Sequence, residues 1–115
     1  MSKIHTLEFR EINRDTFDLI CNGKKTLDTR AATDKYATIS EGDTILFSCG
    51  ADTCTKKVTN VERFPSIEAI YQKYKPHEIN PTWKNEQDGR DAWASFPNYT
   101  EKIHQYGLIA LTLIK

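Results

Sequence analysis

The segment from Gly23 to Arg30 brings a turn, an ammonium, a carboxylate and a guanidinium within a few residues. It reads GKKTLDTR and follows a stretch with helical spacing. If the chain is extended after the turn, Asp28 and Arg30 lie on one face, because successive side chains of a strand alternate. A guanidinium binds phosphate or carbonyl groups, and a carboxylate accepts hydrogen bonds from amino groups. The pattern predicts a polar binding site at Lys24, Lys25, Asp28 and Arg30.

A structural interpretation of the same residues is simpler. Asp28 and Arg30 could pair with each other, or with neighbours, on a solvated strand face, as exposed ion pairs often do. Composition alone favours this interpretation, and the spacing does not decide between the two. The residues by themselves therefore leave both open.

The histidines and cysteines show no spacing that is typical of a metal site. There are three of each, at His5, His77, His104, Cys21, Cys49 and Cys54. No histidine has a metal-binding partner three or four residues away, and the cysteines form an odd set without a Cys-x-x-Cys pair. We therefore expect no metal and no cofactor. We also expect no disulfide framework, and thiols that are buried or idle.

Aromatic side chains gather in the second half of the chain, at Trp83, Trp93, Phe96 and Tyr99. Beside a basic site, such rings could stack on nucleobases. In loop-rich regions, aromatic rings more often hold an irregular segment against the core. The second interpretation is favoured, and it leaves room for one ring to line the site.

Basic residues farther along the chain could enlarge the positive region around Lys24 and Lys25. Lys56, Lys57 and Arg63 fall in one expected strand. If the two basic segments lie side by side, a polyanion could bind across both; the default alternative is a solvated strand face. Because 16 Lys and Arg balance 16 Asp and Glu, nucleic-acid binding would need such a local patch.

The elements that must position these residues are short strands and short helices. Strands are expected at residues 4–9, 24–30, 44–49, 54–63 and 106–114, of which 44–49 and 54–63 form an antiparallel hairpin. Helices are expected from Asn13 to a left-handed cap at Gly23, from Ser66 until Pro76, and around 84–95. The remainder of residues 76–100 has no clear periodicity.

Size and composition restrict the class of protein. With 115 residues, 38% hydrophobic and 28% charged, we expect one globular domain over residues 1–115 with its own core. No apolar run approaches the roughly 20 residues that span a bilayer. The first residues carry charges where a signal peptide needs an apolar region. We therefore expect a cytoplasmic protein with no membrane partner.

The order of these motifs resembles the ASCH domain, a member of the PUA-like superfamily. Its specific part is G-x-K-x-x-(E/D)-x-R followed by G-D-x-(I/L)-x-F, which here falls on Gly23, Lys25, Asp28, Arg30, Gly42, Asp43, Ile45 and Phe47. The closing YGLIA is similar to the family's last strand. The resemblance implies an α+β fold, a small and mostly antiparallel β-barrel with flanking short helices. It also implies a polar cleft lined by the motif side chains, with Tyr106 near it.

The resemblance implies two possible kinds of function, ligand binding and catalysis. Family members have been regarded as RNA-binding modules. Some small bacterial members remove an acyl group from the exocyclic nitrogen of cytidine with a Lys, a Thr and a Glu, and others have been associated with ribonuclease activity. The lysine matches Lys25, but Asp28 stands at the threonine position, where a carboxylate replaces a hydroxyl nucleophile poorly. Binding of RNA or a modified nucleoside is therefore favoured over catalysis.

Two alternatives stay open at this point. A hydrolase of N4-acylated cytidine or of RNA would use Lys25 as its base, with Asp28 or Glu78 holding the attacking water. A protein-interaction module would instead bind a protein partner, with little salt dependence and no retention of nucleic acid.

Overall fold

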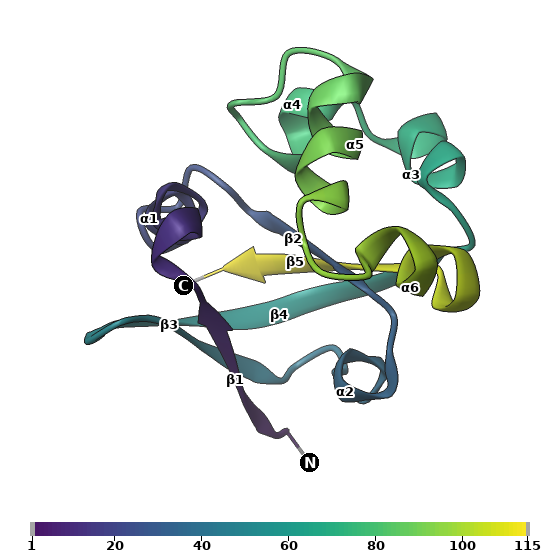
Figure 1. The fold of residues 1–115 in the computed structure, drawn as a ribbon. Helices are drawn as coiled ribbons and strands as arrows, with labels where there is room; N and C mark the ends of the chain where they lie inside the picture. Colours follow the sequence, from purple (N-terminus) through teal and green to yellow (C-terminus); the bar gives the residue numbers. More distant parts are fainter. Residues whose placement is uncertain (1, 115) are drawn as a thin grey trace. The chain divides into compact units, whose positions relative to one another are not determined.

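The fold is described from a computed structural model, for residues 2–114. The elements in chain order are β1 (Ile4–Phe9), the 3-10 helix η1 (Glu11–Asn13), α1 (Arg14–Cys21), β2 (Leu27–Ala31), α2 (Asp34–Ala37), β3 (Thr44–Cys49), β4 (Asp52–Phe64), α3 (Ile67–Lys73), α4 (Pro76–Ile79), α5 (Glu86–Ala94), α6 (Tyr99–Tyr106) and β5 (Leu108–Ile114). The strands form one mixed sheet in the order β1-β3-β4-β5-β2. The expected α+β class is confirmed (Figure 1).

The contacts of the chain divide it into two compact units, and three strands run from one unit into the other. The first unit holds the residues up to Asp28, Ile39–Val61 and the residues from Leu111 onward. The second unit holds Thr29–Thr38 and Glu62–Ala110. Among the described residues, no helix has both the length and the hydrophobicity needed to cross a membrane.

The core of the first unit is built on β3, whose side chains alternate between buried and half-buried positions. Ile45, Phe47 and Cys49 are fully buried, as the period of a strand with one covered face requires. The expected hairpin is confirmed, because β3 pairs antiparallel with β4. On its other side β3 pairs with β1 in parallel, so this part of the sheet departs from the antiparallel expectation. A parallel pair needs a long crossover, and residues 10–43 supply it.

Asp43, a motif residue, fixes the start of β3 within the first unit. Its carboxylate accepts hydrogen bonds from the backbone N–H of Lys3 and of Ser40, both at 2.9 Å, and from His5 Nε2 at 2.8 Å. Burial by itself raises the pKa of Asp43, but these hydrogen bonds outweigh it and lower the pKa to about 2. The motif aspartate therefore joins the residues at and before the start of β1 to the turn that precedes β3.

We expect Asp43 to make stability depend on pH in the acid range. Its pKa is depressed in the folded state, so its contribution is complete above the ordinary value of 3.8 and is lost as the pH falls towards about 2. Asp43→Asn should lower the free energy of unfolding at pH 7 by about 1–3 kcal/mol. Thermal melting between pH 7 and pH 2 should then show a flatter pH dependence.

The control for this experiment is Asp18→Asn, which changes an exposed carboxylate on α1. This variant should keep the acid slope of the unmodified protein. If Asp43→Asn and Asp18→Asn follow the same curve as the unmodified protein, Asp43 does not anchor the start of β3.

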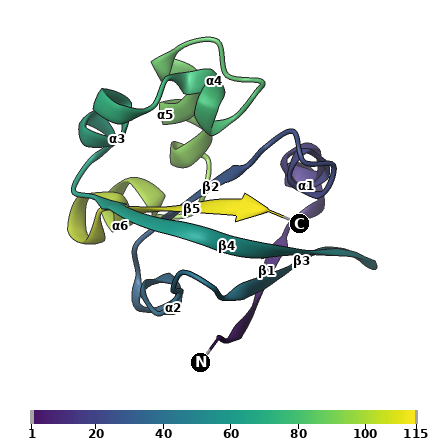
Figure 2. The same cartoon turned by 180° about the vertical axis from the view of Figure 1, so that it is seen from behind.

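The second unit contains the helices α2–α6, of which α3 and α5 begin at side-chain caps. Ser66 Oγ accepts from the N–H of Ala69, which confirms the expected cap, and Asn85 Oδ1 accepts from the N–H of Asp88. An ion pair between Arg90 of α5 and Glu68 links two of these helices. Figures 1 and 2 both show α3, α4 and α5 side by side.

The aromatic side chains of the second unit pack against one another. Trp93 is buried, and its ring centroid lies 5.2 Å from that of Trp83 and 6.0 Å from that of Tyr71. The Trp93 indole N–H donates to Thr29 Oγ1 at 3.1 Å, and Tyr99 Oη accepts from the N–H of Ala31 at 3.0 Å. These contacts support the interpretation that the rings hold this helical segment in place.

Candidate ligand-binding site at Gly23–Arg30

The turn between α1 and β2 is wrapped back onto the end of the helix. Gly23 has φ +84°, which confirms the left-handed cap expected there. The N–H of Gly23 donates to the carbonyl of Ile20 at 3.2 Å, and the N–H of Lys25 donates to that of Leu19 at 2.9 Å. These bonds satisfy carbonyls that a helix end otherwise leaves without partners. The position of the Lys25 backbone is therefore set by α1.

The two adjacent lysines of the turn have opposite environments. Lys24 is exposed, whereas Lys25 is only 5% exposed and its Nζ donates to the carbonyl of Leu27. Removing an ammonium from water opposes folding unless its hydrogen bonds are met by other groups. The Lys25 side chain is thus buried and bonded to the backbone, whereas the Lys24 side chain faces solvent.

Asp28 is also buried, at 3% exposure, and it belongs to the same unit as Lys25. The alternative in which Asp28 and Arg30 lie on a solvated strand face is therefore wrong for Asp28. Arg30, two residues later in β2, is half-buried and belongs to the second unit, where its guanidinium lies 5.5 Å from the ring centroid of Tyr36. Strand β2 therefore carries the two charged residues in different surroundings.

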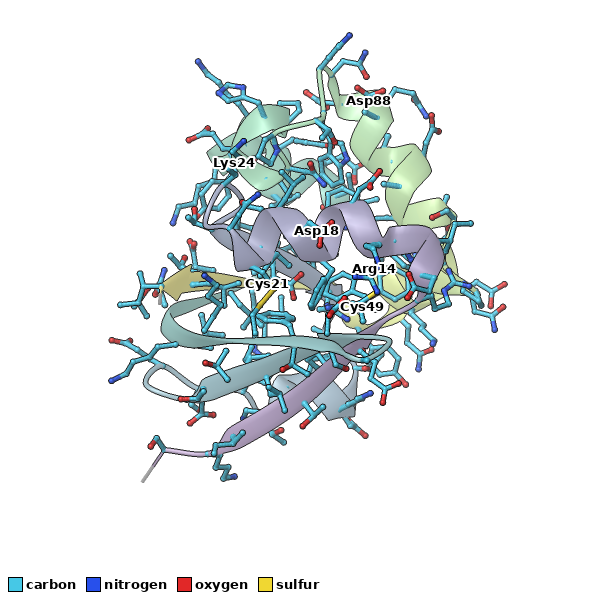
Figure 3. The ribbon with its side chains drawn as sticks, turned by 90° about the vertical axis from the view of Figure 1, so that its left-hand side faces the viewer. Arg14, Asp18, Cys21, Lys24, Cys49 and Asp88 are labelled. Carbon is cyan, nitrogen blue, oxygen red and sulfur yellow. A yellow bond between two sulfur atoms is a disulfide. The ribbon has the colours of Figure 1, made fainter. Side chains whose placement is uncertain are left out.

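Two of the three cysteines form a disulfide, so the expectation that all three are buried or idle thiols was wrong. Cys21 at the end of α1 is bonded to Cys54 of β4, with their Cα atoms 5.8 Å apart (Figure 3). Cys49 is the remaining thiol and is buried. The partners are 33 positions apart, and their proximity depends on how α1 packs on the hairpin, which spacing does not reveal. The bond lies next to the turn that carries Lys25.

The expectation that Lys56 enlarges a positive surface was wrong as well. Lys56 is 5% exposed, and its Nζ donates to the carbonyl of Cys21 at 3.3 Å. A cation is favourable at this place, because the carbonyl end of a helix carries partial negative charge. Lys57 is exposed in the first unit, whereas Arg63 is exposed in the second. The strand pattern held a usable signal: Lys56 is two residues from buried Val58 and shares its face.

Tyr106 and Glu78, the remaining predicted site residues, both lie in the second unit. Tyr106 is the last residue of α6 and is 46% exposed, so the strand expected from Tyr106 begins only at Leu108. Glu78 is exposed on α4, and its Oε1 accepts from the N–H of Lys75 at 2.8 Å. The described residues contain no group of three His, Cys, Asp or Glu side chains placed to hold a metal ion.

The side chains of this segment are of types that can bind a polar ligand. Lys25 and Asp28 supply a cation and a carboxylate near the start of β2, and Arg30 supplies a fork of N–H donors. The hydroxyl of Thr29 is already bonded to the Trp93 indole. The resemblance places Asp28 where the amidohydrolases carry threonine, and a carboxylate replaces an activated hydroxyl nucleophile poorly.

Two solved structures share the fold of this chain. The crystal structure of hypothetical protein PH0355 superposes with a TM-score of 0.80 at 24% sequence identity, over 96% of each chain. The solution structure of protein PF0455 from Pyrococcus furiosus gives a TM-score of 0.74 at 22% identity, over 96% of this chain and 94% of that one. Comparison with curated proteins gives no match. The model of the ASCH domain matches residues 11–115, so the chain belongs to the ASCH domain family.

Proposed function

We propose that the protein binds RNA or a modified nucleoside through Lys25, Asp28 and Arg30. The observation that carries this proposal is the burial of Lys25 and Asp28, which are 5% and 3% exposed within the family's motif. Buried charges contribute little net stability, and well-packed apolar residues often serve a core as well or better. A role in ligand binding therefore explains these two buried, ionisable residues better than a contribution to stability does.

The side-chain types suit the edge of a nucleobase. A carboxylate accepts from the exocyclic amino group of cytosine, and an ammonium donates to a ring carbonyl. A guanidinium binds a carbonyl edge or a phosphate with two parallel hydrogen bonds. Single-stranded RNA and free nucleosides expose these edges, whereas an RNA duplex hides them.

The test is a binding titration combined with product analysis. The protein, Lys25→Met and Arg30→Gln are titrated with a short single-stranded RNA and with cytidine. The same proteins are incubated with N4-acetylcytidine and RNA, followed by chromatography. Each variant should weaken binding about tenfold to a hundredfold, because a hydrogen bond to a charged group contributes about 1.5–3 kcal/mol. The matched control is Lys102→Met, which removes an exposed lysine of α6.

The result that supports the proposal is weakened binding in both site variants, with melting temperatures near that of the unmodified protein and unchanged binding in Lys102→Met. Equal affinities in all four proteins would overturn the assignment of the site. Release of cytidine or of RNA fragments that is lost in Lys25→Met would identify a hydrolase. Retention of neither ligand would favour a protein partner.

A further inference from the structure

The single-turn helix α2 lies in a part of the chain for which the sequence predicted no element (Figure 1). A second group of basic side chains lies near it. We call Arg30, Lys35, Tyr36 and Arg63 the α2 surface; all four belong to the second unit. Its residues come from β2, from α2 itself and from the end of β4. The surface therefore depends on the fold and cannot be recognised from one sequence motif.

The backbone that leads into α2 is firmly held. The N–H of Ala31 donates to Tyr99 Oη at 3.0 Å, and the N–H of Ala32 donates to the carbonyl of Gly107 at 2.9 Å. Both alanines are buried. The N–H of Ala37 closes the turn on the carbonyl of Thr33 at 2.9 Å. These hydrogen bonds hold the backbone of α2 in place, so less conformational entropy is lost when a ligand binds to its side chains.

Positive charge converges on this turn. The Arg30 guanidinium and the Lys35 ammonium each lie 5.5 Å from the centre of the Tyr36 ring. Arg63 donates from Nη2 to the carbonyl of Ala37 at 2.9 Å. Lys35 and Arg63 are exposed, and Tyr36 is half-buried. The α2 surface thus holds three cations, and α2 itself contributes one carboxylate, Asp34, whereas the whole chain has a formal net charge of 0.

This composition fits a phosphodiester chain. A bound anion would be attracted by all three cations of this surface. Arginine and lysine are the side chains that contact phosphates, and an aromatic ring among them offers a stacking face to an unpaired base. An acidic protein surface would use the charges but not the ring. Arg30 belongs both to the α2 surface and to the proposed nucleoside site.

We propose that the α2 surface contacts the phosphates of single-stranded RNA, so that the ligand is a polymer and not a free nucleoside. This inference rests on the proposed function and narrows its ligand class. It predicts that Lys35 and Arg63 contribute to RNA binding while contributing nothing to the binding of cytidine, which has no phosphate.

The experiment compares the protein with Lys35→Glu, with Lys35→Gln/Arg63→Gln, and with the control Lys84→Gln/Lys102→Gln. The control removes two exposed lysines of the same unit. The probe is a fluorescent oligouridylate of about 12 nucleotides, within the usual site size of single-strand binders. Affinity is measured over a series of salt concentrations, and cytidine binding is measured in parallel. Lys35→Glu is included because Lys35 is exposed and its loss leaves the fold intact.

We expect about a tenfold loss of RNA affinity in both test variants and none in the control. The slope of log affinity against log salt should fall by about 1.4 in the double variant, since each lost contact to a single strand contributes about 0.7. Cytidine binding should not change. If the double variant binds RNA like the control while Lys25→Met does not, the α2 surface is excluded and the proposed function stands. If the unmodified protein retains cytidine but no RNA, this inference fails and the proposed function stands. If it retains neither, both proposals fail.

Discussion

Gly107→Ala should unfold most of the protein at temperatures where the unmodified chain is folded. Gly107 ends α6 with φ 77° and ψ −166°, a region of backbone conformation that is essentially restricted to glycine. An added Cβ would lie 2.4 Å from the carbonyl oxygen of Phe64 and 3.3 Å from Cα of Pro65. Both atoms belong to the backbone, so they cannot rotate away as a side chain would.

The expected loss is about 3–5 kcal/mol, the sum of backbone strain and overpacking. This is a large part of the 5–15 kcal/mol that holds an ordinary domain together. Urea unfolding followed by circular dichroism measures it. Gly42→Ala is the control, because Gly42 has φ +93° but no atom within 4 Å of the added Cβ. It should lose only about 1–2 kcal/mol from left-handed strain. Equal losses in the two variants would show that the Phe64 carbonyl plays no part.

Reduction of the disulfide between Cys21 and Cys54 should cause the second largest loss in the free energy of unfolding. The bond closes a loop of 33 residues, and a closed loop of this length restricts the unfolded chain by about 3–4 kcal/mol in the entropy model. Excess dithiothreitol reduces the bond by thiol–disulfide exchange, and the reagent is oxidised to its cyclic disulfide. The free energy of unfolding should fall by about 2–4 kcal/mol. The number of alkylatable thiols should rise from one to three.

Two variants test whether this bond is responsible for the loss of stability on reduction. Cys21→Ser/Cys54→Ser should have the lower stability without any reagent and should not respond to dithiothreitol. Cys49→Ala, which removes the buried thiol, should respond as the unmodified protein does. A stability that stays constant while alkylation shows three free thiols would mean that the bond does not stabilise the fold.

Local signals predicted the elements that depend on local interactions. The strand Thr44–Cys49 and the cap at Ser66 are present as expected, because alternation and a capping hydroxyl act within a few residues. Pro76 was expected to stop a helix, yet it also begins α4, since proline suits the first turn of a helix. The final strand was expected from Tyr106, but α6 extends to that residue and the special backbone of Gly107 separates the two.

The candidate site depends on burial, which residue types alone do not determine. Lys24 and Lys25 have the same side chain and neighbouring positions, yet one is exposed and the other buried. Lys56 and Lys57 repeat this contrast in β4. In a strand, a shift of one residue exchanges the two faces, and packing against distant segments fixes the choice. The disulfide and the α2 surface likewise join residues far apart in sequence, so neither has a local signal.

The position of β2 beside β5 has a consequence for the order of events during synthesis. The N–H of Leu113 donates to the carbonyl of Thr26, and the N–H of Ala32 donates to that of Gly107, so β2 takes its neighbour from about 80 residues later in the chain. A ribosome produces the motif strand about 80 residues before its partner. Until β5 is made, α1 and the β3–β4 hairpin can form, but both edges of β2 are unpaired. The segment that carries the proposed ligand contacts is thus completed only after β5 has been made.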